Sequence, residues 1–126
     1  MTPGEYILVV DDDADFREAL CEVLNHAGYP VAQAENGEAA LARVAEEAPG
    51  IVLLDLKMPV LDGWGVMERM RGDARSSAIP ILILSAYGFE WEAELLGAQG
   101  YIPKSVGMDE ILDRVSKAAG PPPLRH

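Results

Sequence analysis

Residues 51–63, IVLLDLKMPVLDG, begin with four apolar residues, place an acid after them at Asp55, and continue into Pro59 and Gly63. A short apolar run is typical of a strand that is covered on both faces, as strands of a parallel sheet are. Proline and glycine are typical of a loop. Apolar side chains at helical spacing follow in residues 64–71. The segment therefore predicts a buried strand that ends in an acid, then a loop and a helix.

The same alternation of a short apolar run and an amphipathic stretch recurs along the chain. We predict strands at residues 6–10, 31–34, 51–55, 79–85 and 101–102. We predict helices at residues 14–27, 36–48, 64–71, 89–96 and 108–119. Strands that alternate with helices predict an α/β fold, an open parallel sheet with helices on both faces. In such a sheet a ligand binds beyond the carboxyl ends of the strands.

Several polar residues are interpreted as helix or turn signals rather than as site residues. Asp13 and Asp15 favour the start of the first helix, because acids suit helix N-termini. Asn36 is a candidate cap for the second helix. Asp62 and Gly63 are typical turn residues.

The composition fits one acidic globular domain. The chain has 126 residues, 49% of them hydrophobic, and ten Lys and Arg against 21 Asp and Glu give a net charge of −11. We expect a single domain over residues 5–119, followed by a Pro-rich tail or linker stub at residues 120–126. The hydrophobic content excludes a disordered acidic tail. The negative charge disfavours direct binding to nucleic acid and favours metal cations or a basic partner surface.

Two further features concern the cellular compartment. No apolar run approaches the ~20 residues that span a bilayer, and the first five residues lack the basic region of a signal peptide. Cys21 is the single cysteine, which excludes an internal disulfide and suits a reducing compartment. We therefore expect a cytoplasmic protein without membrane insertion.

Polar and charged residues stand where the predicted strands end. Asp11 and Asp12 follow the first strand, Asp55 ends the third, Ser85 ends the fourth, and Lys104 follows the fifth. Carboxylates that are brought together repel one another, and a divalent cation or an ammonium group relieves that repulsion. Mg²⁺ binds through one or two carboxylates together with waters and phosphate oxygens. The set therefore predicts a site for Mg²⁺ and a phosphoryl group.

Four motifs in this order resemble the receiver domains of bacterial response regulators. They are residues 7–13 (ILVVDDD), 53–59 (LLDLKMP) with 62–63, 84–86 (LSA), and 97–101 (GAQGY) with Lys104. The resemblance covers nearly the whole chain, residues 5–119. It implies a doubly wound (βα)5, flavodoxin-like fold with strand order 2-1-3-4-5.

The resemblance also implies roles for the acids. Asp55 would be the phospho-acceptor and the nucleophile. Asp11, Asp12 and Asp55 would bind Mg²⁺, together with the backbone carbonyl of Lys57. Mg²⁺ would thus be the cofactor of the site.

Further roles are implied for residues around the acids. Ser85 would hydrogen-bond one phosphoryl oxygen, and Lys104 would pair with another. Tyr101 would turn inward when the Ser85 hydroxyl moves toward the phosphoryl group, so these two residues would form the switch. Lys57 and Tyr87 would flank the attacking water and tune hydrolysis of the acyl phosphate.

Two features depart from the family pattern. Ser105 follows Lys104, where the family usually has a proline after a cis bond. A cis bond before serine is costly, so the aim of Lys104 stays open. The segment between Ser85 and Tyr101 is about one helical turn shorter than usual, which implies a short or displaced fourth helix.

The function implied is that of a phospho-acceptor domain of a two-component system. It would take a phosphoryl group from a histidine kinase or a phosphotransfer protein and signal through protein contacts. The output protein would meet the fourth helix and the fifth strand, where Phe89 and Trp91 are candidate contact residues, since exposed aromatic side chains often mark interaction surfaces.

Two other classes of protein are disfavoured by the sequence, and a third is left open. An aspartyl phosphatase usually carries a second Asp two residues after the nucleophile, where this chain has Lys57, so a turnover enzyme is not expected. A flavin-binding protein needs a loop rich in Ser, Thr and Gly after the first strand, where this chain has acids. The alternative left open is a receiver-like scaffold that binds proteins without phosphorylation, which Ser105 and the short fourth helix favour.

Overall fold

The computed structural model describes residues 1, 5–86 and 97–123. Its strands form one parallel sheet in the order β2-β1-β3-β4-β5. The strands are β1 (Ile7–Val10), β2 (Val31–Ala34), β3 (Ile51–Leu54), β4 (Ile81–Ser85) and β5 (Gly100–Pro103). The helices are α1 (Ala14–His26), α2 (Gly37–Glu46), α3 (Gly63–Arg71), the 3-10 turn η1 (Lys104–Val106) and α5 (Met108–Ala119). The predicted doubly wound sheet and its strand order are confirmed.

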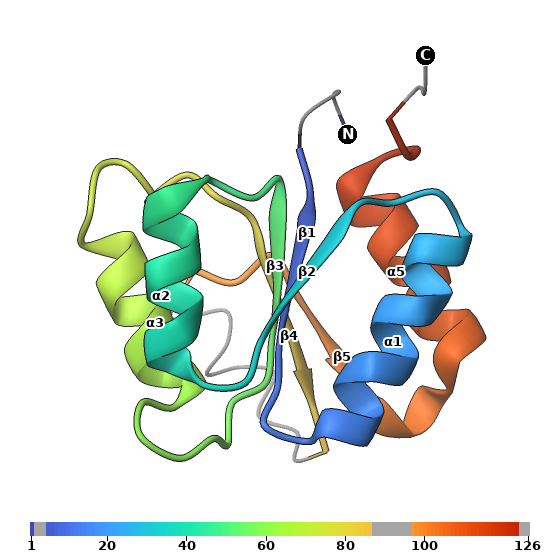
Figure 1. Cartoon of the computed structure of the whole chain (residues 1–126), viewed down its shortest axis with the longest axis horizontal. Coiled ribbons are helices and arrows are strands. Elements are labelled where there is room, and N and C mark those ends of the chain that lie inside the picture. The colour runs from blue at the N-terminus through green and yellow to red at the C-terminus, as the bar shows by residue number, and fades with distance from the viewer. Residues whose placement is uncertain (2–4, 87–96, 124–126) are drawn as a thin grey trace.

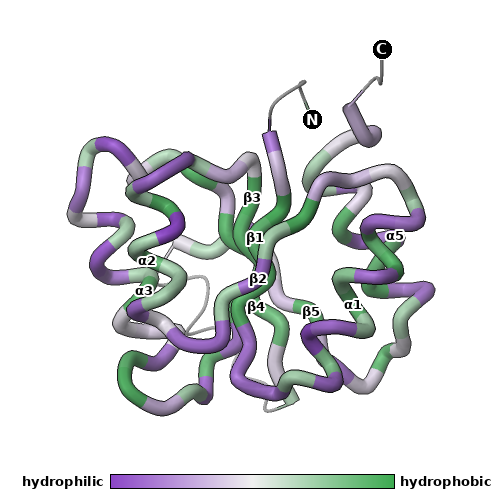
Figure 2. Tube along the Cα trace, in the orientation of Figure 1, coloured by the Kyte–Doolittle hydropathy of each residue, from purple (hydrophilic) through white to green (hydrophobic). Residues whose placement is uncertain are grey.

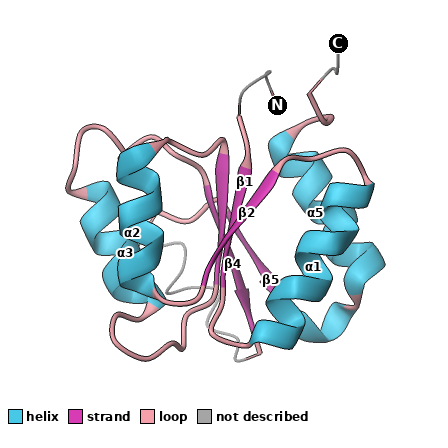
Figure 3. Ribbon diagram, viewed as in Figure 1, coloured by secondary structure: helices cyan, strands magenta, loops and turns pink. Residues whose placement is uncertain are grey.

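The helices lie in two layers, with α1 and α5 on one face of the sheet and α2 and α3 on the other (Figures 1 and 3). Alternate residues of each strand point to opposite faces. In β1, Leu8 and Val10 therefore join the core under α2 and α3, and Ile7 and Val9 join the core under α1 and α5. Figure 2 shows the hydrophobic colour along the strands and the hydrophilic colour on the outward turns of the helices.

The predicted helix starts are confirmed at three positions. The side chain of Asp13 accepts a hydrogen bond from the backbone of Phe16, and that of Asn36 accepts one from Ala39. The side chain of Asp62 accepts a hydrogen bond from the backbone of Gly65. Asp62 is therefore the cap of α3, whereas we predicted only a turn residue. Each cap satisfies one backbone N–H that has no partner inside its helix.

Several predicted boundaries differ from those observed by one or two residues. The fourth strand begins at Ile81 rather than at 79, because Ile79 donates its N–H to the preceding turn at Ser76 and Pro80 has none to donate. The fifth strand is longer than predicted, since Gly100 and Pro103 both pair with β4. The second helix ends at Glu46 rather than 48, and the third strand at Leu54 rather than 55. The fourth predicted helix, residues 89–96, lies outside the described residues.

The first residues of the predicted tail contact the rest of the chain. The buried Tyr29 donates its hydroxyl proton to the carbonyl of Gly120. The amino group of Met1 donates to the carbonyls of Ala119, at 2.9 Å, and Pro121, at 3.1 Å. A β-carbon at Gly28 would lie 3.3 Å from the side chain of Pro122. Gly120 and Pro122 are therefore packed against the turn between α1 and β2.

Among the described residues, no helix combines the length and the apolar character that crossing a bilayer requires.

We predict that Tyr29→Phe lowers the free energy of unfolding by about 1 kcal/mol, the usual net value of one hydrogen bond. Urea denaturation monitored by circular dichroism measures it. In a chain that ends at Ala119 the acceptor on Gly120 is gone, so Tyr29→Phe should cost nothing further there. An equal cost in both chains would show that the hydroxyl does not act through the tail.

Candidate functional site

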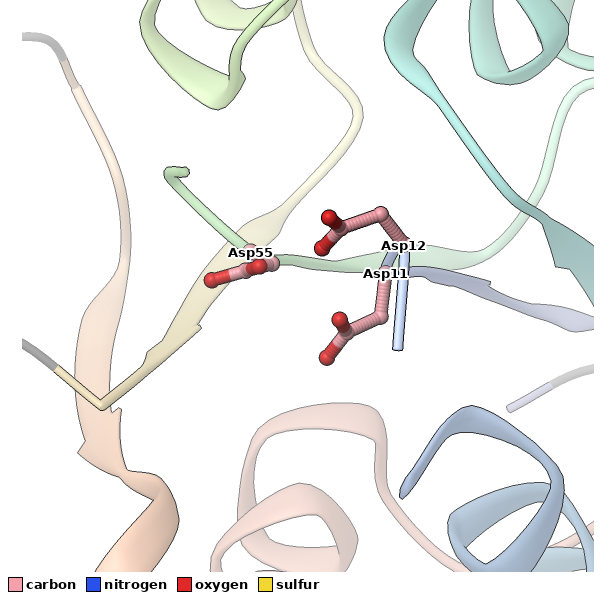
Figure 4. Close-up of side chains that lie close together, drawn as sticks. All are labelled: Asp11, Asp12 and Asp55. Atoms are coloured by element: carbon pink, nitrogen blue, oxygen red, sulfur yellow. The ribbon is translucent and has the colours of Figure 1, made fainter. Parts of the chain in front are cut away.

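Three carboxylates meet at the carboxyl end of the sheet. Asp11 and Asp12 follow β1 directly, and Asp55 follows β3. These two strands are neighbours, with Val10 paired to Leu54, so the next residue of each strand comes to the same place. Ligand oxygens of the three acids lie within 4.8 Å of one another. Figure 4 shows the three side chains extending into one space.

Asp11 is the most enclosed of the three acids, with 1% of its surface exposed. Its Oδ1 accepts a hydrogen bond from the backbone N–H of Asp13 at 3.0 Å. Its Oδ2 is buried and accepts no hydrogen bond, although the ammonium of Lys104 lies 2.6 Å away as an ion pair. Asp12, by contrast, is exposed at the mouth of the cluster.

Asp55 is a weaker acid than an ordinary aspartate. Burial raises its pKa to about 6, and the negative charge of Asp11 adds to the rise. Lys104, whose ammonium lies 3.7 Å from Asp55 Oδ2, pulls the pKa in the opposite direction, as does a hydrogen bond from the backbone of Lys57. Desolvation and like-charge repulsion prevail. The carboxylate is therefore held at high energy in the metal-free protein.

Lys104 reaches the acids although the loop after β5 lacks a cis peptide bond. The described residues contain none, and Lys104 opens the 3-10 turn η1 directly after Pro103. Its side chain is 17% exposed and lies against both Asp11 and Asp55. The ring of Phe16 lies on another side, with its centroid 4.6 Å from the ammonium. The question that Ser105 left open is thus answered: Lys104 is aimed into the cluster.

Ser85 and Tyr101 lie next to this cluster on β4 and β5. Ser85 is the last residue of β4 and is 1% exposed. Tyr101 is half-buried against the core under α2 and α3. Its hydroxyl donates to the backbone carbonyl of Ser85 across a long distance of 3.4 Å. The two residues of the predicted switch are therefore in contact.

The loop between Asp55 and α3 is tightly folded. Gly63 donates its N–H to the carbonyl of Leu56 at 2.9 Å, and a β-carbon at Gly63 would overlap the carbonyl oxygen of Asp55. Val60 is exposed and has a φ of 71°, a left-handed conformation that is costly for a β-branched residue. A groove of about 410 Å³ runs along this loop beside Asp12, lined also by Lys57 and Trp64.

Sequence reasoning missed two residues at this end of the sheet. Phe16, in the first turn of α1, carries in the sequence only the signal of an apolar helix position. Arg17 was not singled out, yet it donates to the backbone carbonyl of Asp11 at 2.8 Å and to the Gln33 side chain at 2.8 Å. Their position in the first helical turn after the acids indicates that they lie near the site. Tyr87, Phe89 and Trp91 lie outside the described residues.

The residues present fit a hard divalent cation. Three carboxylates offer the oxygen ligands that Mg²⁺ prefers. Asp11 Oδ2 is buried, and the positive charge that compensates it is the Lys104 ammonium 2.6 Å away. The single ammonium of Lys104 is shared between two of the acids.

Comparisons with known proteins agree with this geometry. The family model described as "Response regulator receiver domain" matches residues 7–116. The sporulation initiation phosphotransferase F of Bacillus subtilis is 41% identical over 117 residues, which cover 90% of this chain and 93% of that protein. A putative response regulator from Chloroflexus aurantiacus has a solved structure with a TM-score of 0.84 and 32% identity, covering 91% of this chain and 97% of that one.

Other relatives are longer. The probable transcriptional regulator ycf27 of Porphyra purpurea is 40% identical over 114 residues, which cover 88% of this chain but 46% of that protein. The chain thus spans about half the length of several of the relatives that it matches. The chain belongs to the response regulator receiver domain family of two-component signalling.

Proposed function

We propose that Asp55 is the residue that accepts the phosphoryl group in this receiver domain. The observation that carries the proposal is a buried carboxylate placed between a lysine ammonium and two further acids. The donor would be a histidine kinase or a phosphotransfer protein. Transfer forms a bond between an Asp55 carboxylate oxygen and phosphorus and breaks the bond from phosphorus to the donor, which keeps the electron pair.

The chain's own residues supply charge and position for this transfer. Asp55 must be ionised to attack, and with a pKa of about 6 it is mostly ionised at pH 7. Lys104, 3.7 Å from Asp55 Oδ2, offsets the negative charge that gathers on the phosphoryl oxygens. Positioning and charge stabilisation are the main sources of catalysis in phosphoryl transfer.

The metal that we assign to the site is Mg²⁺. Asp11, Asp12, Asp55 and the backbone carbonyl of Lys57 would hold it. When bound, it neutralises the carboxylates and the incoming phosphoryl group. Lys104 lies 2.6 Å from Asp11 and 3.7 Å from Asp55, so one ammonium faces two buried carboxylates and a divalent cation would neutralise the remaining charge.

The output would begin at Ser85 and Tyr101. A phosphoryl group on Asp55 adds charge and acceptor oxygens next to the end of β4. If the Ser85 hydroxyl turns toward that group, the contact between Ser85 and the Tyr101 hydroxyl changes as well. The partner is then a protein that recognises the surface near β5, with Phe89 and Trp91 as candidate contacts. We assign to the domain no turnover reaction on a separate substrate. We also propose that it acts in the cytoplasm, where such phosphoryl donors act.

We predict that the wild-type chain gains one phosphoryl group from acetyl phosphate in the presence of Mg²⁺, measured as intact mass. Asp55→Asn should gain none, because the nucleophilic carboxylate is lost. Asp62→Asn is the matched control, since Asp62 caps α3 in the same loop but lies outside the carboxylate cluster.

If the wild-type chain gains nothing and also fails to bind Mg²⁺ with beryllofluoride, the proposal is wrong. The alternative of a scaffold that works without phosphorylation would then replace it.

We predict a distinct pH dependence for the metal-free protein. The pKa of Asp55 is raised from 3.8 to about 6 by folding, so the folded state favours the protonated form. The contribution of Asp55 to the free energy of unfolding is therefore highest below pH 4 and falls as the pH rises through 4 to 6. The full loss is at most about 3 kcal/mol, at 1.36 kcal/mol per pKa unit.

Urea denaturation in EDTA checks this prediction. Asp55→Asn should be more stable than wild type at pH 7.5 and should lose that advantage as the pH falls toward 4. Asp113→Asn, on the exposed face of α5, is the control. A difference between wild type and Asp55→Asn that stays constant over this range would contradict the shifted pKa.

We further propose that Lys57 and Tyr87 shield the acyl phosphate from water. Lys57→Ala and Tyr87→Ala should then each shorten the half-life of the phosphorylated chain, because smaller side chains admit water more easily. The half-life is measured from the loss of the phosphoryl mass over time. Lys117→Ala, an exposed lysine of α5, is the control for charge. Unchanged half-lives in both variants would refute the shielding.

A further inference from the structure

Lys104 lies against an aromatic ring that has no role in the proposed metal binding or phosphoryl transfer. The ring of Phe16, in the first turn of α1, has its centroid 4.6 Å from the Lys104 ammonium. The same ammonium lies 2.6 Å from Asp11 and 3.7 Å from Asp55. We propose that Phe16 is a positioning residue, whose ring face holds Lys104 over the acid cluster during phosphoryl transfer to Asp55. This inference rests on the proposed function of Asp55.

The backbone places Lys104 beside the acids, since it follows Pro103, which pairs with Ser85 of β4, but it does not fix the position of the ammonium. Neither η1 nor α5 has a side-chain cap, and the two are joined at Gly107, which has a φ of 91° and nothing within 4 Å of its β-carbon position. The lysine itself has a flexible four-carbon stem. Its direction therefore depends on the groups that its ammonium touches.

Two of those groups change charge during the proposed reaction, and the third does not. Asp55 becomes an acyl phosphate, and the charge of Asp11 is shared with any bound cation. The Phe16 ring attracts a cation through its quadrupole and stays the same throughout. The ring can thus keep the ammonium in place while its ion-pair partner changes from Asp11 to a phosphoryl oxygen on Asp55.

Phe16 is itself held firmly toward the site. Its backbone N–H donates to the side chain of Asp13, 3.2 Å away, which caps α1. The next residue, Arg17, donates to the carbonyl of Asp11 and to the side chain of Gln33. Its ring is half-buried against the core under α1 and α5. The first turn of α1 is therefore tied to the residues that carry the acids.

The test compares variants with and without an aromatic face. Phe16→Leu keeps an apolar side chain but loses the ring, and we expect it to slow Mg²⁺-dependent phosphorylation by acetyl phosphate about fivefold to tenfold. Phe16→Tyr keeps the ring and should stay near the wild-type rate. Val23→Ala, a half-buried position further along α1, is the control for a general loss of packing.

A double-mutant cycle separates this role from a structural one. In a Lys104→Ala background, where the ammonium is gone, Phe16→Leu should slow phosphorylation no further. An equal slowing in both backgrounds, or no slowing in the wild-type background, overturns the inference.

A second readout does not depend on phosphorylation. The Lys104 Cε protons should show an upfield ring-current shift in the NMR spectrum of the unphosphorylated wild type, and Phe16→Leu should abolish it. If the shift is missing, the ring does not hold the ammonium, and the inference fails while Asp55 can still be the acceptor. If the shift is present but the wild type is never phosphorylated, the proposed function fails, and the role of Phe16 in transfer fails with it.

Discussion

Parallel pairing of β1 with β3 forces Asp11 and Asp55 together, because each acid is the next residue along its strand after the pair Val10 and Leu54. Asp55 is buried, so water cannot screen the repulsion well, and its pKa rises to about 6. Lys104 relieves part of this repulsion by lying against both acids. The pairing of the strands therefore keeps two carboxylates in an unfavourable electrostatic arrangement. Binding of a cation, or a reaction at Asp55, changes the energy of that arrangement.

Much of this arrangement could be predicted from local sequence. Four-residue apolar strands with acids at their ends predicted where the carboxylates gather, since parallel strands bring their carboxyl ends to one edge. Asp13 and Asn36 also acted as helix-start residues, as predicted. The direction of the Lys104 side chain could not be predicted, because the neighbouring sequence does not determine where a long, flexible side chain points. It follows from contacts with Asp11 on β1 and Phe16 on α1, which only the packed fold brings near.

The tight loop after β3 limits how Asp55 can move. Gly63 has no room for a β-carbon beside the Asp55 carbonyl, and Val60 is held in a left-handed conformation. Strained backbone of this kind persists only where surrounding contacts fix it. Here those contacts are the cap by Asp62 and the hydrogen bond from Gly63 to Leu56. Asp55 is thus held by the loop and α3 on one side, while the Lys104 ammonium beside it lies against Phe16 of α1.

The Met1 amino group donates to the carbonyls of Ala119 and Pro121 at the end of the sheet where β1 begins, opposite the acids. Figure 1 shows both termini at this end. Strands of four residues span about 13 Å at ~3.3 Å per residue, so at least that length of sheet separates the two ends. A fluorophore, an affinity handle or a second domain joined there would leave the approach to Asp55 clear. The two ends of the sheet can therefore be used separately: one carries the acids, and the other is free to carry an attachment.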